Sequence, residues 1–274
     1  MKYLLLIAII FSVALNSCEE TVSDVTLPYV EQLVIRAIIS PGQGINSITV
    51  ERTLPPLDEY IKENAIVRDA KLTISDGTND YELSFDGEFY GNEEIFVEVG
   101  KTYYLRAEWK GKVATSQTTI PEPVEIDEIY YEIVEHKYEY ENFRYKEVFV
   151  YGEFTPKPGA VYQTSYNSES LQLRFDFDIY SYNNRNAAGK IRTVLLRFSY
   201  DETMGEEFIK NYIKDYEFLL YSYDEQYYSY FNSRHNGSSN SGIFGSDGLN
   251  VQWNVHGNGI GLFIGHSSTM TRYE

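Results

Sequence analysis

Cysteine, basic residues and long apolar runs are all scarce in this sequence. Cys18 is the only cysteine among 274 residues, so the chain cannot form an internal disulfide. Lys and Arg number 23 against 41 Asp and Glu, which leaves a net charge of -18 at pH 7. This charge disfavours binding to nucleic acid and adsorption to an anionic lipid surface. After residue 17, no apolar stretch approaches the roughly 18 residues of a membrane-spanning helix, so we expect no further transmembrane segment.

Catalytic signatures are also missing. The sequence has no H-E-x-x-H, G-x-S-x-G, P-loop or C-x-x-C motif. A nucleophile needs a base within hydrogen-bond reach, but the four histidines form no recognisable catalytic pattern. If Asn258 and Gly259 form a two-residue hairpin turn, His256 and His266 would lie on the order of 17 Å apart, too far to share a metal. We therefore predict no enzyme, no cofactor and no metal site.

Two other interpretations of the polar residues stay open. Asp176 and Asp178 would share a strand face about 7 Å apart and could bind a hard cation such as calcium, although a solvated strand edge is the simpler interpretation. Carboxylates are abundant, so the sequence alone does not exclude a pair that acts on glycosidic bonds. The glycine-rich residues 257–261 precede a predicted strand and not a helix, which argues against a phosphate-binding loop.

The N-terminus, by contrast, has a clear pattern. Lys2 is followed by an apolar run that is too short for a permanent membrane anchor, and small polar residues come next. This layout predicts a signal peptide over residues 1–17. Residues 15–18 read LNSC, which resembles a bacterial lipobox, with Asn16 departing from the usual small apolar residue. Cys18 is therefore the predicted site of lipidation.

Lipidation would also explain why the one thiol is retained. An unpaired cysteine in an oxidising envelope is a liability unless it has another role. The roughly two or three acyl chains of a bacterial lipoprotein, at about 0.8 kcal/mol for each buried methylene, would hold the mature chain on a membrane. Residues 18–29 would then form a lipidated tether. Glu19 and Glu20, directly after the cysteine, resemble a surface-export signal or belong to a solvated tether, and the sequence leaves both interpretations open.

Residues 30–121 alternate apolar and polar side chains in short segments, as half-buried strands do. We expect strands at residues 33–39, 47–54, 70–77, 81–85, 102–111 and 112–121. Turn signals such as Asp76-Gly77 and Asp86-Gly87 separate them. This spacing is typical of an immunoglobulin- or transthyretin-like β-sandwich. Pro121 and Pro123 cannot donate to a β-ladder and mark the predicted joint with the next domain.

Residues 122–274 are predicted to form a second antiparallel β domain with one short helix. Strands are expected at residues 126–134, 146–155, 171–182, 191–200 and 216–221. Ser222 and Glu225 read as a capping box that begins an aromatic helix at about residues 223–233. A closing hairpin is expected over residues 249–266, with Asn258 and Gly259 in the turn. The predicted fold class is therefore mostly β.

Tyrosine is abundant, with 26 residues against 2 Trp. Aromatic side chains suit pleated, half-buried surfaces, so most of these tyrosines are expected to pack within sheets. Some could instead form a platform for a glycan or a peptide. Long polar loops carry function more often than cores do, so residues 131–145 and 238–248 supply the candidate contacts. These candidates are Tyr138, Tyr140, Ser238 and Asn240.

Three sets of residues together resemble a known family. They are the lipobox, the strand pattern that ends in TYYLRAEWKG and TTIPEPVEIDEI, and a late aromatic helix, SYDEQYYSYFNS, followed by NGIGLF. The combination resembles the Bacteroidota family catalogued as domain of unknown function 4249, over roughly residues 33–266. Residues 257–263 look like its glycine-rich closing hairpin, whereas residues 238–248 lack the proline-containing segment expected before it. The resemblance implies an outer-membrane lipoprotein, often associated with TonB-dependent transport, and offers no catalytic residues to carry over.

The leading hypothesis is a lipid-anchored outer-membrane lipoprotein that acts as a binding or accessory component of an uptake system. Its expected partners are the membrane, through the lipid on Cys18, and an outer-membrane TonB-dependent transporter, whereas nucleic acid is not expected. Both the cell surface and the periplasmic face agree with the sequence. The alternatives are a surface glycan hydrolase and a purely structural or adhesive lipoprotein.

Overall fold

The computed structural model describes residues 28–137, 144–168, 173–176, 189–200, 205–236 and 251–274. By internal contacts, the described residues from 31 to 54 and from 59 to 274 form one compact unit that holds all the named helices and strands, whereas residues 28–30 and 55–58 belong to a second unit. Seven predicted site residues lie outside the described residues: Cys18, Glu19, Glu20, Tyr138, Tyr140, Ser238 and Asn240. No helix in the described part of the chain is long and apolar enough to cross a membrane.

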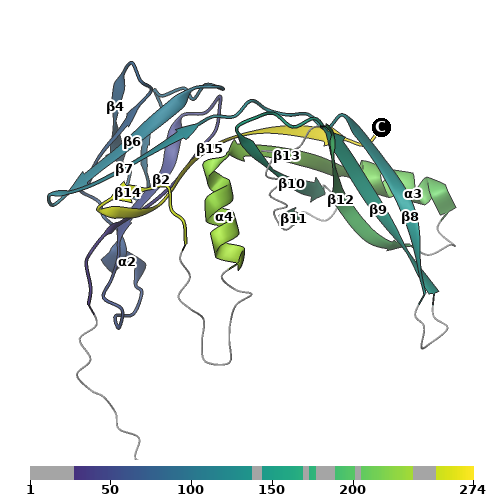
Figure 1. Ribbon diagram of the computed structural model, residues 1–274, viewed down its shortest axis with the longest axis horizontal. Helices are drawn as coiled ribbons and strands as arrows, with labels where there is room; N and C mark the ends of the chain where they lie inside the picture. Colours follow the sequence, from purple (N-terminus) through teal and green to yellow (C-terminus); the bar gives the residue numbers. More distant parts are fainter. Residues whose placement is uncertain (1–27, 138–143, 169–172, 177–188, 201–204, 237–250) are drawn as a thin grey trace, which may run out of the picture. The chain divides into compact units, whose positions relative to one another are not determined.

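The chain is mostly β, as predicted (Figure 1). Its strands are β1 Leu33–Ile39, β2 Ile45–Arg52, β3 Lys71–Ser75, β4 Asp80–Phe85, β5 Tyr90–Asn92, β6 Thr102–Trp109, β7 Lys112–Thr119, β8 Glu128–Lys137, β9 Arg144–Phe154, β10 Ala160–Ser168, β11 Leu173–Asp176, β12 Ile191–Tyr200, β13 Tyr216–Asp224, β14 His256–Gly257 and β15 Gly259–Arg272. The helices are α2 Lys62–Ala65, α3 Gly205–Lys214 and α4 Gln226–Asn236.

The described strands form two sheets. One has twelve strands in the order β11-β10-β13-β15-β1-β2-β5-β4-β3-β6-β7-β14, and the other has three in the order β12-β9-β8. The large sheet curls, because β15 lies beside β1 and also reaches β7, where Gly265 N donates to Thr118 Oγ1 at 2.7 Å. Most neighbouring strands are antiparallel, but β1 and β15 run parallel.

The first hydrophobic core lies inside the curl formed by β1 to β7 and the start of β15. Strand β6 shows how the sequence builds it, because the side chains of Tyr103, Leu105 and Ala107 are fully buried while Tyr104 and Arg106 face outward. This period of two is the one that the sequence predicts for a half-buried strand. The cluster also contains these buried residues: Leu33, Ile35, Ile48, Val50, Leu72, Ile74, Trp109, Ala114 and Phe263.

The second core lies between the three-stranded sheet, β10 and β13. Its members include Val148, Val150, Phe154, Tyr162, Tyr166, Leu195, Leu196, Tyr216, Phe218 and Leu220. Helix α3, which the sequence analysis did not predict, adds Ile209 and Ile213, one turn apart on the same helix face. Along the chain, Ile120 still belongs to the first core and Val124 already belongs to the second. Because β15 pairs with β1 and also with β13, the division into domains at residues 121 and 122 stays a prediction.

The predicted closing hairpin over residues 249–266 is wrong in its pairing. Strand β15 pairs with β1 (Leu33 opposite Gly259) and with β13 (Tyr223 opposite His266), while β14 pairs with β7 (His256 opposite Thr115). Within residues 251–266, the described part of the predicted hairpin, one backbone hydrogen bond links the two arms, from Val255 N to Gly261 O at 3.3 Å. The glycines in β15 explain the difference, because they let other strands approach too closely for a side chain.

The predicted helix is present as α4, but it begins later than expected and the capping box is wrong. Ser222 is fully buried within β13, whose ladder with β10 runs on to Asp224. Asp224 Oδ1 accepts a hydrogen bond from Gln226 N at 3.0 Å, so an aspartate receives the first backbone N–H group of α4. Ser222 therefore pairs with β10 as part of a strand and does not cap the helix.

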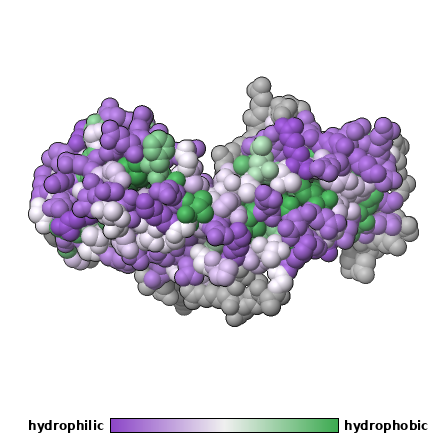
Figure 2. All heavy atoms as spheres, turned by 90° about the horizontal axis from the view of Figure 1, so that it is seen from above, coloured by the Kyte–Doolittle hydropathy of each residue, from purple (hydrophilic) through white to green (hydrophobic). Residues whose placement is uncertain are grey.

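The outer surface agrees with the acidic, polar composition. The face seen in Figure 2 is mainly hydrophilic, and apolar residues show only in separate small areas. Among the described residues, twelve large apolar side chains are exposed, including Phe96 at 70%, Ile38 at 57% and Met270 at 57%. Scattered exposure of this kind is ordinary for a folded protein.

Candidate functional site

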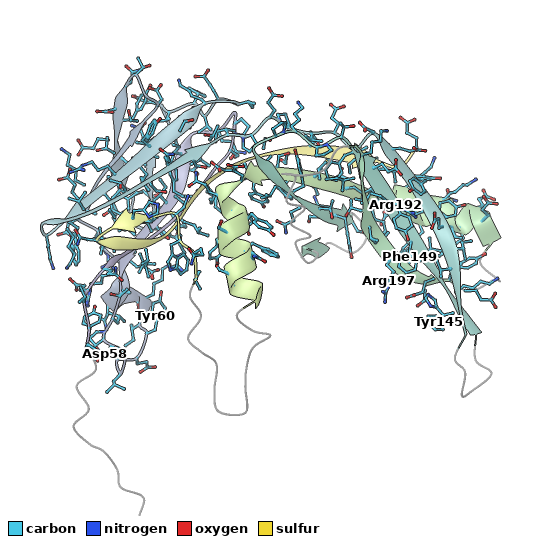
Figure 3. The ribbon with its side chains drawn as sticks, viewed as in Figure 1. Asp58, Tyr60, Tyr145, Phe149, Arg192 and Arg197 are labelled. Atoms are coloured by element: carbon cyan, nitrogen blue, oxygen red, sulfur yellow. The ribbon has the colours of Figure 1, made fainter. Side chains whose placement is uncertain are left out.

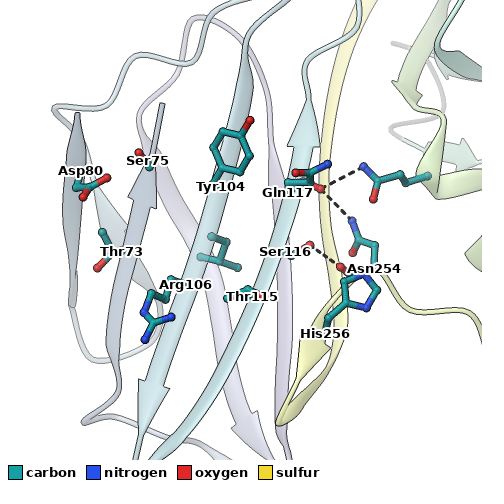
Figure 4. Close-up of a pocket in the computed structure, with 12 residues that line it drawn as sticks. Thr73, Ser75, Asp80, Tyr104, Arg106, Thr115, Ser116, Gln117, Asn254 and His256 are labelled. Atoms are coloured by element: carbon teal, nitrogen blue, oxygen red, sulfur yellow. Dashed lines mark hydrogen bonds between the residues drawn. The ribbon is translucent and has the colours of Figure 1, made fainter. Parts of the chain in front are cut away.

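A groove lies on the outer face of β3, β6 and β7, and its floor consists of two rows of side chains. In the first row, Tyr104 of β6 lies between Ser75 of β3 and Gln117 of β7, because the strand register pairs it with both. Asp80 of β4 extends the row on the other side of Ser75. Tyr104 is 45% exposed, so its ring is available from the groove. Figure 4 shows this row across neighbouring strands.

The second row runs parallel to the first along the same face. Arg106 lies opposite Thr73 on one side and Thr115 on the other, and Thr115 lies opposite His256 of β14. Thr115, Arg106 and His256 are all exposed. The row therefore continues from one end of the groove to the β14 edge of the sheet, as Figure 4 shows.

The wall of the groove is formed by Gln226 of α4 and by Asn254, and hydrogen bonds attach this wall to the floor. Gln117 O accepts from Gln226 Nε2 at 3.3 Å and from Asn254 Nδ2 at 3.5 Å (Figure 4). Ser116 Oγ donates to Asn254 O at 2.7 Å. The side chain of Asn254 also bonds both backbone groups of Phe263, at 2.9 and 2.7 Å. Side chains thus replace a partner strand along this part of the β7 edge.

A buried carboxylate completes this arrangement. Asp224, which is only 3% exposed, accepts from Thr118 Oγ1 at 2.9 Å and from Thr119 N at 2.6 Å. Because Asp224 also accepts from Gln226 N, one carboxylate joins β7 to the start of α4. A buried charge is tolerated only with such hydrogen bonds, and here they fix the position of α4 beside the groove.

The groove has a volume of about 580 Å³ and a mainly polar set of lining side chains. Its lining residues are Thr73, Ser75, Asp80, Tyr104, Leu105, Arg106, Thr115, Ser116, Gln117, Gln226, Asn254 and His256. Asp80 is the one carboxylate among these residues. The side chains of Tyr104, Thr115 and His256 make no hydrogen bond within the described residues, so the groove offers polar groups that are free to meet a ligand.

The charge of the groove is nearly balanced. Arg106 Nε donates to Glu108 Oε1 at 2.8 Å, and both side chains are about half exposed. The hydrogen bond from Arg106 holds the pKa of Glu108 below its usual value. In the turn after β3, Asp76 Oδ2 lies 2.8 Å from Lys101 Nζ. The hydrogen bond from Lys101 lowers the pKa of Asp76. The positive charge of Arg106 is therefore compensated by Glu108.

A second aromatic and charged surface lies on the outer face of the three-stranded sheet (Figure 3). Arg192 lies over the Tyr151 ring at 3.7 Å from its centroid, and Arg197 lies over Phe149 at 5.6 Å. Arg197 also pairs with Glu147 at 3.2 Å. Because these groups already bind one another, the surface mainly stabilises its own sheet.

The histidines fall in different surroundings. His136 Nε2 lies 2.8 Å from Glu147 Oε2, His235 belongs to α4, and His256 lines the groove. His266 lies against tyrosines of β13, and its burial lowers its pKa. Within the described ranges, no group of three or more His, Cys, Asp or Glu is placed to hold a metal ion.

Of the groove residues, only His256 stood out in the sequence, as one of two histidines predicted to lie too far apart to share a metal. Asp176 is the last residue of β11, and Asp178 lies outside the described residues, as do the four predicted contact residues. The outward positions of β6, Tyr104 and Arg106, could have been found from the alternation in TYYLRAEW. Their meeting with Asn254 and His256 could not, because it depends on which strands pair.

The fold and the groove together define a mostly β protein that carries an open polar groove on an outer sheet face. The family model described as Domain of unknown function (DUF4249) matches residues 19–272, so the chain belongs to this family. The family resemblance drawn from the sequence motifs is thereby confirmed, while the Bacteroidota lipoprotein context stays a prediction. No curated protein matches the sequence.

Proposed function

We propose that this protein is a lipid-anchored binding protein of the bacterial outer membrane. The observation that carries the proposal is the groove on β3, β6 and β7, which combines uncommitted polar side chains on its floor with a wall fixed by hydrogen bonds. A preformed concave site with a few directed polar groups is typical of ligand binding. The lipobox at residues 15–18 supports the anchor, with lipid on Cys18 and residues 18–29 as the tether.

The same proposal assigns the protein an accessory role in uptake through an outer-membrane TonB-dependent transporter. The support is the implied context of the family, together with a groove that could collect a ligand near a membrane. Gentle detergent extraction followed by affinity purification should recover a stoichiometric barrel partner. A purely structural or adhesive lipoprotein would be recovered without one, so this experiment separates the two alternatives.

A glycan hydrolase receives less support from the groove. Such an enzyme uses a pair of Asp or Glu residues on either side of the bond that is cleaved. Asp80 is the one carboxylate among the residues that line the groove. Binding without cleavage is therefore the function that we propose for this site.

The anchor is tested by fractionation of cells that express the Cys18→Ala variant. We expect the variant to leave the membrane fraction, because acyl chains attached through Cys18 supply the membrane affinity. Ser17→Ala is the matched control, since it keeps a small residue directly before the cysteine and should stay with the membrane. If Cys18→Ala remained with membranes as firmly as Ser17→Ala, the anchor would be disproved.

Protease treatment of intact cells then decides which face of the membrane the protein occupies. Digestion of the mature chain in intact cells is the result expected if Glu19 and Glu20 act as an export signal. Protection until the cells are lysed would assign the protein to the periplasmic face and would leave these two acids as part of a solvated tether.

A further inference from the structure

We propose that the groove on β3, β6 and β7 binds a neutral oligosaccharide, with the Tyr104 ring as the surface on which one sugar ring stacks. The inference rests on the proposed role of the groove as a binding site and names the class of its ligand. It is based on the exposure of one aromatic ring, the chemistry of the side chains around it, the charge balance and the length of the groove.

Tyr104 has the placement of a stacking residue. Its backbone is held in β6 between β3 and β7, so the ring projects from a rigid part of the sheet. The side chain is 45% exposed and makes no ring contact with another described aromatic residue. A tyrosine supplies a large, rigid contact area at a low cost in conformational entropy and has a polar end as well. These properties suit the mixed apolar and polar faces of a sugar ring.

The side chains beside Tyr104 suit the hydroxyl groups of a sugar. Thr73 and Thr115 have hydroxyls, and the side-chain amide of Gln117 has both a donor and an acceptor. The floor can therefore donate hydrogen bonds to a ligand hydroxyl and accept hydrogen bonds from it. Gln117 binds Gln226 and Asn254 through its backbone carbonyl, and its side chain makes no hydrogen bond within the described residues. The groove therefore presents hydrogen-bonding groups on both sides of the ring.

The charges favour a neutral ligand over an anionic one. Arg106 is the one arginine or lysine that lines the groove, and it is paired with Glu108. Asp80 contributes a negative charge to the lining, and the whole chain has a net charge of -18. A field of this sign repels anions as they approach.

The length of the groove favours an oligosaccharide over a single sugar. From Thr73 to His256 the second row crosses β3, β6, β7 and β14, which is about 14 Å at the usual spacing between strands. Tyr104 lies in the adjacent row, near the middle of this span. A ligand could therefore stack on Tyr104 and extend toward His256 at the β14 edge.

The test uses the full mature chain from Cys18 onward, extracted in a zwitterionic detergent that has no sugar headgroup. Native gels containing neutral polysaccharides (α-glucan, β-glucan, mannan, xylan and galactan) are compared with gels containing anionic polygalacturonate. We expect at least one neutral polysaccharide to retard the protein, and calorimetry with its oligosaccharides to give a dissociation constant. Tyr104→Ala should weaken that binding about tenfold or more, since the stacking surface is lost.

Three further variants make the result specific. Phe96→Ala, which removes another exposed aromatic ring, should bind as the original protein does. Tyr104→Phe should keep most of the affinity because the ring remains, and Gln117→Ala should lose several-fold while the wall stays intact. Thermal melting of each variant identifies any loss that comes from unfolding.

Three outcomes would overturn the proposal. They are the absence of retardation by every neutral polysaccharide, retardation by polygalacturonate alone, and equal binding by Tyr104→Ala and Phe96→Ala. None of them bears on membrane attachment, which is decided by the Cys18→Ala fractionation. A failure of the glycan assignment is thus distinguishable from a failure of the proposed anchored binding protein.

Discussion

At the scale of single residues, His266 is a half-buried titratable group whose protonation opposes folding. Its ring lies 5.7 Å from that of Tyr221 and 5.4 Å from that of Tyr223, and the surrounding protein lowers its pKa. Partial burial against these rings removes water from the imidazole, which disfavours its positively charged form. The folded state therefore binds a proton at this site less readily than the unfolded state does.

This difference predicts a pH dependence of stability. Because the pKa of His266 is lower in the folded protein, its contribution is fully present above the unfolded value, near 6.5, and is lost as the pH falls toward the folded value. Urea unfolding at pH 7.5 and at pH 5.5 should show a loss of unfolding free energy that is smaller in His266→Gln. The exposed His256→Gln variant is the control and should keep the original pH dependence. Equal pH dependence in all three proteins would contradict the prediction.

At the scale of secondary-structure elements, the position of β15 depends on close contact with β1. Gly261 has φ +128°, and a Cβ atom built there would lie 1.9 Å from Ile35 O. Only glycine fits both the backbone conformation and the available space. The contact explains why residues 259–261 of the glycine-rich stretch form part of a parallel strand pair and not a simple hairpin.

Substitution of Gly261 should therefore be severe. Gly261→Ala is expected to lower the unfolding free energy by at least about 3 kcal/mol, since both strain and a backbone clash arise. Gly42→Ala is a matched control, because Gly42 has φ +75° but no atom within 4 Å of an added Cβ atom. It should cost only about 1–2 kcal/mol. Chemical denaturation of the two variants measures the difference, and equal losses would show that strand packing at Gly261 does not matter.

Local sequence patterns predicted much of the element structure and little of the pairing. The expected strands at residues 33–39 and 191–200 agree with β1 and β12, because alternation with a period of two is a local signal. The helix α3 was missed although its acids lie in the first turn and Ile209 and Ile213 share one face. The groove was missed for a different reason: its wall joins Gln117 to Gln226 and Asn254, which are distant in sequence.

At the scale of the whole molecule, the negative charge predicts how the protein behaves near a membrane. With a net charge of -18, the folded chain should not adsorb to anionic lipid by itself. In flotation assays with anionic vesicles, Cys18→Ala protein should stay in the soluble fraction at both low and physiological salt. The chain that keeps Cys18, lipidated as we propose, is the positive control in the same assay. Adsorption of Cys18→Ala protein that disappears at high salt would reveal a basic surface that the composition does not indicate.

Strand β15 has a consequence for the order in which the protein acquires its structure. Its first half completes the sheet around one core, and its second half pairs with β13 beside the other. It also follows every other described strand along the chain. During synthesis, β1 therefore pairs with β15 only after all the intervening strands have been made. Long-range pairing of this kind is slow. Until residues 259–272 have been synthesised, β1 and β13 each lack the neighbour that β15 supplies, so the sheet edges beside both cores stay unpaired.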